Sequence, residues 1–366
     1  MVKHNILAQV LFFSYCLHLS DSSITCRNRF GLPVDWFVAY KLPKPAGEAE
    51  CSGTELLYAD NAADNWQSPE DIKSMQSSVA LTLSQYYKSL NDSTTFYMLY
   101  NDENPGADRS DNSHGHAKGA IVFDKRSGFL LIHSVPHFPP PNTYEYPISG
   151  LRNGQSFLCI TFAAEELNTL AVQMHYTQPS IYQSQLPVYF ATRYPLLQKV
   201  IAMQRFQRKI KVFSSVKHLK SLSGIPFLSF AKYKEYRKDL YADFVAPAIK
   251  QTLFVETWLN GPGDLSSSCN TAYKVMNVLS IRLQNFTFPS SKDHSKWAIS
   301  NDDNEPYLCI GDINRQVSQT MRSGGTMCFQ NKNLWKVFKK SIIKVEPCKT
   351  AKVISFWKNI KKLYGS

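Results

Sequence analysis

Two copies of one short pattern constrain the fold of this chain more than any other feature of its sequence. In the first copy His116 is followed two residues later by Lys118, and in the second His294 is followed by Lys296; an apolar run begins just after each lysine. Residues two apart in a strand project to the same side. We therefore expect the first histidine and lysine to face one pocket at the mouth of a strand, and the second copy to repeat this arrangement.

The two copies match over more than the histidine and the lysine. An aspartate follows each histidine by eight residues (Asp124, Asp302) and an isoleucine follows it by sixteen (Ile132, Ile310). The intervening residues are typical of a strand, a polar turn and a second strand. Such a repeat predicts two similar halves in one chain. We predict a mixed α/β fold in which two halves related by a pseudo-twofold axis each contain a β-sheet flanked by helices.

Local patterns predict the elements of these halves. Apolar runs bounded by turn residues predict strands at 34–43, 96–100, 119–123, 129–135, 157–162, 254–259 and 273–283. Helices are expected at about 68–90, 163–174 and 333–344, from about Tyr194 into the basic, helical-looking stretch 205–220, and at the surface over 230–245. Proline and glycine residues around 179–187 mark the predicted boundary, which divides the mature chain into residues 24–180 and 181–366.

The N-terminus predicts export from the cell interior. Lys3, the apolar stretch 6–19 and a small polar region after it are typical of a signal peptide over residues 1–23. No later apolar stretch reaches the roughly 18 residues that a membrane span needs. We therefore expect a protein of the secretory pathway without a membrane span, either lysosomal or extracellular.

The cysteines and two sequons agree with that expectation. Outside the signal peptide the chain has seven cysteines and no Cys-x-x-Cys pair, so three disulfides and one free or intermolecular thiol are the simplest arrangement. Asn91 and Asn285 lie in Asn-x-Ser/Thr sequons and are predicted glycosylation sites.

The charge of the chain indicates a class of partner. The formal net charge is +12 and the sequence pI is about 9.2. This balance favours polyanions such as nucleic acid, heparin-like glycans or an anionic membrane surface, although a basic and inert surface is the simpler alternative. A third His-x-Lys match, His218 and Lys220, has no following strand or aspartate, and we interpret it as a solvated face.

The two His-x-Lys pairs suit phosphodiester cleavage. A neutral imidazole can attack phosphorus and form a covalent phosphoryl-enzyme, while a protonated imidazole on the opposite side gives a proton to the leaving oxygen. Two ammonium groups can offset the charge on the non-bridging oxygens, which metal ions do in other enzymes. The sequence has no His-Glu-x-x-His, EF-hand or Gly-x-x-x-x-Gly-Lys motif, so we expect no metal and no cofactor. The acidic segment 301–305 is more typical of a solvated turn than of a calcium site.

Several longer segments carry a resemblance to a known family. They are Pro33–Val38, Leu99–Asp102, Gly115–Gly119, His133–Pro136, Ser229–Lys232, Asp293–Trp297, Gly311–Arg315 and Gly324–Cys328. With them the chain resembles the deoxyribonuclease II family of acid endonucleases, whose fold resembles the phospholipase D superfamily, over nearly all of the mature sequence. The resemblance implies metal-independent cleavage of DNA at acid pH that leaves 3′-phosphate ends. It implies catalytic roles for His116, Lys118, His294 and Lys296, with His133 as an additional site position.

The resemblance also implies details that the residues alone leave open. The implied disulfides are Cys26–Cys159, Cys269–Cys348 and Cys309–Cys328, which leaves Cys51 as the odd thiol. Ala298 stands where the family often has a cysteine, a departure that should not touch the chemistry. The phospholipase D motif has its aspartate one residue earlier, so the roles of Asp124 and Asp302, and that of Asn314, stay open.

We therefore expect a deoxyribonuclease in which His116 is the nucleophile and His294 the general acid, with exchanged roles as the alternative. DNA would be held through its phosphates with little base selectivity. Because one chain carries both half-sites, a monomer would suffice. An acid optimum would follow if the lysines disfavour the imidazolium. The rival hypotheses are a phosphodiesterase for RNA or phospholipid, and a non-catalytic DNA-binding or host-interaction protein of the same fold.

Overall fold

The computed structural model describes residues 23–44, 52–205 and 211–348 of the chain. The predicted signal peptide up to residue 22, Cys51 and the end of the basic tail beyond residue 348 lie outside the described residues. Within the described residues, no helix combines the length and the apolar character required to cross a membrane.

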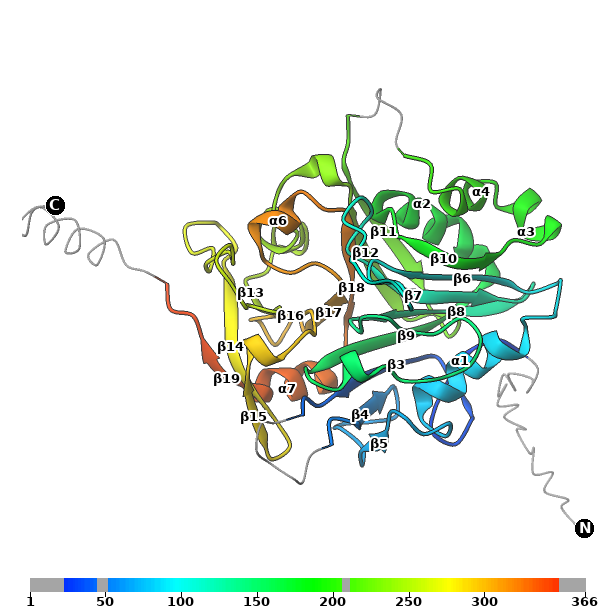
Figure 1. Cartoon of the computed structure of the whole chain (residues 1–366). Coiled ribbons are helices and arrows are strands. Elements are labelled where there is room, and N and C mark those ends of the chain that lie inside the picture. Colours follow the sequence, from blue (N-terminus) through cyan, green and yellow to red (C-terminus); the bar gives the residue numbers. More distant parts are fainter. Residues whose placement is uncertain (1–22, 45–51, 206–210, 349–366) are drawn as a thin grey trace, which may run out of the picture.

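The first half of the chain forms an eight-stranded sheet (Figure 1). In spatial order its strands are β10 (Ile181–Gln185), β6 (Phe96–Asn101), β7 (Lys118–Phe123), β8 (Ser127–His133), β9 (Gln155–Ala163), β3 (Trp36–Lys41), β4 (Glu55–Asp60) and β5 (Glu70–Asp71). A separate pair, β1 (Cys26–Arg27) and β2 (Pro33–Val34), lies at the start of the described chain.

The second half forms a nine-stranded sheet. Its main path is β11 (Ser214–Lys220), β12 (Pro226–Lys232), β18 (Gly324–Gln330), β17 (Tyr307–Gly311), β16 (Trp297–Ser300), β13 (Leu253–Glu256), β14 (Val275–Leu283) and β15 (Phe286–Pro289), and β19 (Ile342–Val345) pairs with β14 off that path.

Five antiparallel strands follow each other in the same way in both sheets. The run β6-β7-β8-β9-β3 of the first sheet corresponds to β13-β16-β17-β18-β12 of the second. The register corresponds as well, because Gly119 pairs with Ile132 in the first sheet and Trp297 pairs with Ile310 in the second. Each of these pairs lies three and sixteen residues after its histidine, so the repeat in the sequence is also a repeat in strand pairing.

The two sheets pack face to face. Along the central strands, alternate residues enter two different apolar clusters: Leu130 and Ile132 of β8 face the other sheet, while Phe129 and Leu131 face outward. The inner cluster joins both sheets, with the rings of Trp36 and Phe329 5.0 Å apart. Because side chains alternate along a strand and both faces are buried, these strands have continuous apolar runs.

Helices cover the outer faces and the edges of this sandwich. The α-helices are α1 (Ser78–Lys88), α2 (Leu167–Thr177), α3 (Val188–Arg193), α4 (Leu196–Ile201), α5 (Ala246–Ile249), α6 (Val317–Thr320) and α7 (Lys332–Ser341). The short 3₁₀ and π turns are η1 (Ile148–Gly150), η2 (Ala164–Glu166), η3 (Lys234–Tyr236), η4 (Tyr241–Val245) and η5 (Ser290–Lys292). Helix α1 covers the outer face of the first sheet, and η4 with α5 covers that of the second. The predicted mixed α/β class, with sheets flanked by helices, is confirmed.

Three local predictions were wrong. The helix expected from Ser68 begins at Ser78, since Ser77 rather than Ser68 caps it by accepting a hydrogen bond from the N–H of Ala80. The basic stretch 205–220 ends in the edge strand β11 and not in a helix. Its lysines are exposed, so the stretch has no apolar pattern that would distinguish a strand from a helix. The surface helix expected over 230–245 is the end of β12 followed by short turns, and Tyr241 and Val245 are fully buried.

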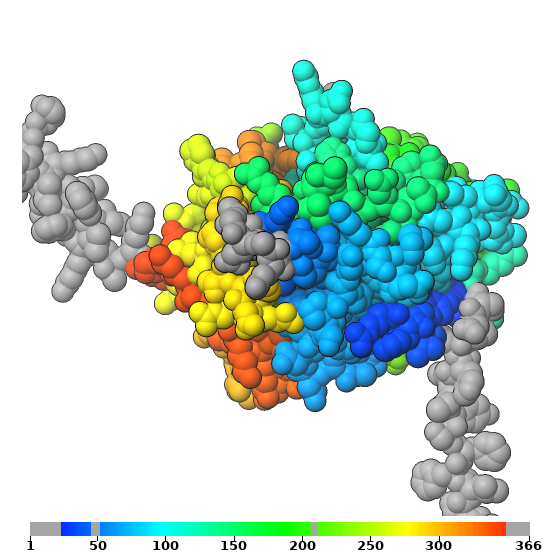
Figure 2. Space-filling model, turned by 60° about the horizontal axis from the view of Figure 1, so that its bottom comes forward, coloured from blue at the N-terminus to red at the C-terminus, as the bar shows by residue number. Residues whose placement is uncertain are grey.

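The two halves meet over a wide area that includes the edges of the sheets. In Figure 2 the segment around β4 and residues 64–66 lies beside α7 and the β14–β15 hairpin. Asn333 of α7 donates a hydrogen bond to Asp64, and the ring of Phe338 lies 5.6 Å from that of Trp66. Strand β10 pairs with β6, so the first sheet extends past the predicted boundary at residue 180, and the division of the chain into two phospholipase D-like halves remains a prediction.

Three disulfides support this packing. They join Cys26 to Cys159, Cys269 to Cys348 and Cys309 to Cys328, the pairs that the family resemblance implies. Cross-links between segments far apart in the sequence restrict the unfolded chain, which stabilises the fold.

Candidate active site

The two His-x-Lys pairs lie at corresponding places: His116 precedes β7 and Lys118 begins it, and His294 and Lys296 directly precede β16. The backbone N–H of His116 donates to the carbonyl of Ser323 at 2.8 Å, and that of His294 donates to the carbonyl of Gly154 at 2.8 Å. Ser323 directly precedes β18 and Gly154 directly precedes β9, so each histidine is held by the other half. Both histidines are partly exposed, whereas Lys118 and Lys296 are each 3% exposed. A ligand could thus reach both rings, with the ammonium groups beneath.

The ring of His116 is oriented by a backbone carbonyl. Its Nδ1 lies 2.6 Å from the carbonyl oxygen of Asp312. Because a carbonyl only accepts, Nδ1 carries the proton, and Nε2 of the neutral ring keeps its lone pair. This is the tautomer that a nucleophile at Nε2 requires. The carboxyl group of Asp312 is buried and accepts a hydrogen bond from the backbone N–H of Lys118; burial raises its pKa to about 8.

Lys118 belongs to a buried charge cluster. Its Nζ forms an ion pair with Asp102 and lies 3.2 Å from Oε1 of Glu103. The guanidinium of Arg322, from the second half, donates to the other carboxylate oxygen of Asp102 at 3.1 Å. Burial alone would raise the pKa of Asp102, but the neighbouring charges of His116, Lys118 and Arg322 hold it below its ordinary value. The carboxylate therefore stays ionised and fixes the Lys118 ammonium.

His294 has a different environment. Its Nε2 lies 2.9 Å from the side-chain nitrogen of Asn153, and its ring lies against Trp258 with the centroids 4.1 Å apart. The Nζ of Lys296 donates to the backbone carbonyl of His294. Burial is the main reason that the pKa of Lys296 falls to about 8, and Lys118 lowers it further. The carboxyl group of Glu256 lies nearby, fully buried with a raised pKa and without a hydrogen-bond partner among the described residues.

Burial lowers the pKa of both histidines. The pKa of His116 falls to about 3; the charges of Lys118 and Lys296 lower it and Asp102 opposes them. For His294 burial again dominates and Lys296 adds to it, so its pKa also lies far below the ordinary value. Both rings are thus neutral at pH 7, and a proton is gained only in acid or when a negative charge binds beside them. The lysine effect that we expected is present, but it is secondary to burial.

His133 is buried near Lys118 and is not exposed to a ligand as His116 and His294 are. The residue is 1% exposed, ends β8, and accepts a hydrogen bond from the N–H of Val135 at 3.2 Å through Nδ1. Its ring packs between Phe138 and Phe157. Burial and the charge of Lys118 lower its pKa to about 3. His133 therefore supports the Lys118 side of the site from below.

The structure locates the three positions whose roles stayed open. Asp124 caps the turn between β7 and β8 by accepting from the N–H groups of Arg126 and Ser127, and Asp302 accepts from the N–H of Asn304 in an exposed turn. Both aspartates are thus turn residues away from the histidines. Asn314 is buried and accepts from the N–H of Trp258 at 3.3 Å, so it fixes the segment that carries the indole against His294.

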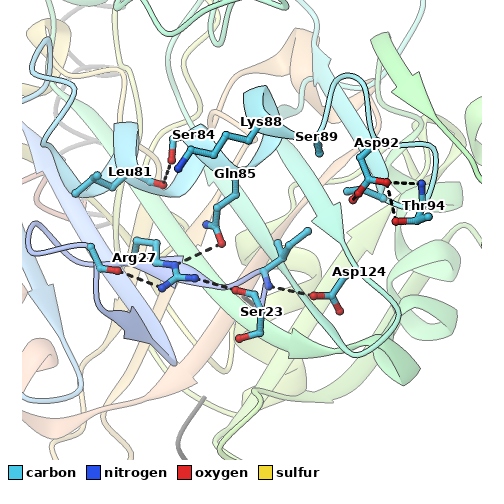
Figure 3. A pocket seen from close by; sticks show the side chains of 13 residues that line it. Ser23, Arg27, Leu81, Ser84, Gln85, Lys88, Ser89, Asp92, Thr94 and Asp124 are labelled. Atoms are coloured by element: carbon cyan, nitrogen blue, oxygen red, sulfur yellow. Dashed lines mark hydrogen bonds between the residues drawn. The ribbon is translucent and has the colours of Figure 1, made fainter. Parts of the chain in front are cut away.

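Other predicted positions lie outside the cluster. Asn91 and Asn285 are exposed in turns, as glycosylation would require. A pocket of about 500 Å³ between α1 and the first described residues is lined by Arg27, Gln85, Asp124 and other polar residues, but by none of the His-x-Lys residues (Figure 3). Among the residues that the structure describes, no group of three or more His, Cys, Asp or Glu is arranged to hold a metal ion.

Sequence reasoning missed several residues of the site. Asp102 and the carbonyl of Asp312 lie inside segments that carry the family resemblance, so that resemblance was a signal for them. Asn153, Arg322 and Trp258 lie in no such segment and have no periodicity that marks them. Asn153 and Arg322 reach the half-site of the opposite half because the two halves pack together, whereas Trp258 lies in the same half as His294 and reaches it through the fold of that half.

Comparison with known proteins agrees with these observations. The model of the family described as Deoxyribonuclease II matches residues 25–348. The chain is 40% identical to "Cell-death-related nuclease 7" of Caenorhabditis elegans, over 98% of this chain and 97% of that one. It is 37% identical to "Deoxyribonuclease-2-beta" of Mus musculus (93% and 97%) and 36% identical to "Deoxyribonuclease-2" of Caenorhabditis elegans (90% and 96%). The chain therefore belongs to the deoxyribonuclease II family.

Proposed function

We propose that this deoxyribonuclease II-type nuclease cleaves DNA internally, at acid pH and without a metal ion, through a phosphohistidine intermediate that yields 3′-phosphate ends. The observation that carries the proposal is the pair of partly exposed imidazoles held across the interface of two similar halves, each above a buried lysine. In-line displacement at phosphorus needs groups on opposite sides of the phosphate, and a pseudo-twofold pair provides them.

In the first step Nε2 of His116 attacks phosphorus with its lone pair. The bond between phosphorus and the 5′ oxygen breaks, and protonated His294 gives its proton to that oxygen. In the second step neutral His294 takes a proton from water, the water oxygen bonds to phosphorus, and the phosphorus–nitrogen bond to His116 breaks. The product is a 3′-phosphate, and both histidines return to their starting states. Lys118 and Lys296 offset the charge of the non-bridging oxygens in both steps.

The low pKa of His294 supports the acid optimum. The step that protonates the leaving oxygen needs the imidazolium form, and the fraction in that form rises as pH falls toward the pKa. A bound phosphate would stabilise the imidazolium further. Activity should therefore rise as pH falls from 7 to 5, and an activity that rises steadily to pH 8 would contradict this proposal.

The setting of the enzyme is part of the proposal. The predicted signal peptide, the exposed sequons at Asn91 and Asn285 and three disulfides support the secretory pathway, with a lysosomal or extracellular destination. Since one chain supplies both histidines, we propose that it acts as a monomer. The net charge of +12 supports binding of DNA through its phosphates.

One experiment tests the chemistry. Purified protein is incubated with supercoiled plasmid at pH 5 in EDTA, in parallel with RNA and phospholipid vesicles. We expect nicked and linear plasmid whose ends a polymerase extends only after phosphatase treatment. Cleavage confined to RNA or lipid, loss of activity in EDTA, or directly extendable 3′-hydroxyl ends would each contradict the proposal. His116→Ala and His294→Ala are the controls, and nicking at the parental rate by either variant would refute the assignment of the site.

A further inference from the structure

Two buried lysines outside the His-x-Lys pairs occupy corresponding positions in the two sheets. Lys41 is the last residue of β3 and pairs with Gln155 at the start of β9. Lys232 is the last residue of β12 and pairs with Gly324 at the start of β18. Both side chains are 0% exposed. Removing an ammonium group from water is unfavourable, so a buried lysine needs strong acceptors, and its acceptors show what it holds.

Each lysine donates to backbone carbonyls of the segment that precedes its neighbouring strand, which for Lys232 includes the end of α6. The Nζ of Lys41 donates to Leu151 at 2.9 Å and to Asn153 at 2.5 Å. The Nζ of Lys232 donates to the carbonyls of Gln319 and Thr320, both at 3.0 Å, and of Arg322. A single ammonium group thus gathers two or three carbonyls that would otherwise repel each other. These contacts fix the shape of both loops.

The same loops reach across to the histidines of the opposite half. The loop held by Lys41 supplies the Asn153 side chain, 2.9 Å from Nε2 of His294, and the Gly154 carbonyl that accepts from the His294 backbone. The loop held by Lys232 continues into Ser323, whose carbonyl accepts from the backbone of His116.

Lys232 acts on a second member of its site as well. The guanidinium of Arg322, whose own carbonyl Lys232 holds, donates to Asp102 at 3.1 Å, and Asp102 pairs with Lys118. The loop of the second half therefore sets both the histidine and the lysine of the first half.

We infer that Lys41 and Lys232 are positioning residues with crossed targets. Lys41, in the first sheet, sets the geometry of His294, and Lys232, in the second sheet, sets that of His116 and Lys118. This inference rests on the proposed function for its kinetic consequence only, because the ring positions themselves can be measured in an inactive protein. Misplacement of a reacting group by about 1 Å can reduce a rate about 100-fold.

The test compares Lys41→Met and Lys232→Met with the parental protein. Steady-state nicking should show kcat lowered about 10- to 100-fold with KM changed less than about threefold, since the groups that meet substrate remain. Lys41→Gln and Lys232→Gln retain an amide group that can donate to a carbonyl, and their kcat should fall less. Leu83→Ala, a core change on the buried face of α1 and remote from the site, is the matched control for loss of stability. If its kcat falls as far as that of the Met variants, the positioning role is refuted.

Histidine side-chain NMR supplies a readout that general destabilisation would not move selectively. Signals are assigned with His116→Gln and His294→Gln. Lys41→Met should change the ring chemical shifts and the titration of His294 and leave those of His116 unchanged. Lys232→Met should change those of His116 and leave those of His294 unchanged. Equal changes in both rings, or none in either, would overturn the inference. If the parental protein fails to cleave DNA, the proposed function fails, but the crossed NMR pattern still tests the positioning role.

Discussion

The two half-sites share a backbone plan but differ in charge. In the first, the carboxylates of Asp102 and Glu103 balance the charge of the Lys118 ammonium, and Arg322 of the other half also pairs with Asp102. In the second, Lys296 donates to the His294 carbonyl, and its buried acidic neighbours Asp293 and Glu256 have raised pKa values, with burial as the main cause.

This difference supports different roles for the two histidines. A carbonyl fixes the tautomer of His116 so that Nε2 is free to attack. His294 contacts an amide and an indole, and burial together with the positive charge of Lys296 lowers its pKa, so its proton is easily given up. A duplicated backbone thus supports two functions once the side chains around it diverge.

The largest expected effect concerns the histidines themselves. His116→Ala and His294→Ala should each lower plasmid nicking by about 1,000-fold or more, because each removes a partner in both chemical steps. A nucleotide 3′-(4-nitrophenyl phosphate) needs no proton on its leaving group. His294→Ala should therefore still release a burst of nitrophenolate, and His116→Ala should not. A burst from His116→Ala alone would reverse the two roles.

The lysines should separate activity from stability. Lys118→Met and Lys296→Met should each lower kcat about 100-fold, because each removes a charge beside the phosphate. Lys118→Met also removes one of the two cations paired with the buried Asp102 and leaves Arg322 in place, so its free energy of unfolding should fall by about 1–3 kcal/mol, whereas Lys296 forms no ion pair among the described residues and Lys296→Met should change it by less than about 1 kcal/mol. Urea unfolding at pH 7 measures both. Equal losses would contradict the charge difference between the half-sites.

His133 gives the first half an additional pH dependence, since the corresponding position in the second half is Gly311. Its folded pKa is about 3, and an unfolded histidine titrates near 6.5. As pH falls below 6.5 the unfolded state takes up the proton first, so stability is lost between pH 6.5 and 3. His133→Phe removes this titration, so between pH 6.5 and 4.5 the variant should lose about 2–3 kcal/mol less of its free energy of unfolding than the parental protein. His218→Gln, at an exposed position on β11, should leave the loss unchanged; the prediction fails if both variants behave alike.

The smallest expected effect concerns Trp258, since no ring of the described residues packs against His116 in the same way. The face of an indole stabilises a cation by about 0.5–1 kcal/mol at partly exposed sites. Trp258→Leu should therefore move the pH of half-maximal activity downward by less than about one unit, with kcat lowered a few-fold. A pH–rate profile of the variant checks this, and an upward shift would show that the indole does not favour the imidazolium.

Local pattern predicted much of the fold where both faces of a strand are buried. The strands beginning near Phe96, Gly119, Phe129 and Phe157 have continuous apolar runs, and they form β6 to β9. Prediction failed where the chain is polar or aromatic at an edge. Strand β11 is largely exposed and its lysines conceal its pairing with β12, while the stretch after Phe230 packs its aromatic residues inward in short turns.

The sequence by itself determined the His-x-Lys repeat, its matching register and the family to which the chain belongs, because these depend on residue types and on spacing along one strand. Only the tertiary structure decided which groups surround His116 and which surround His294. Asn153, Arg322 and the carbonyl of Asp312 each come from the half opposite to the half-site that they contact, and Trp258 comes from a distant segment of the same half as His294. Burial at that interface sets the pKa of each ring, and burial is a property of the packed molecule, not of the local sequence.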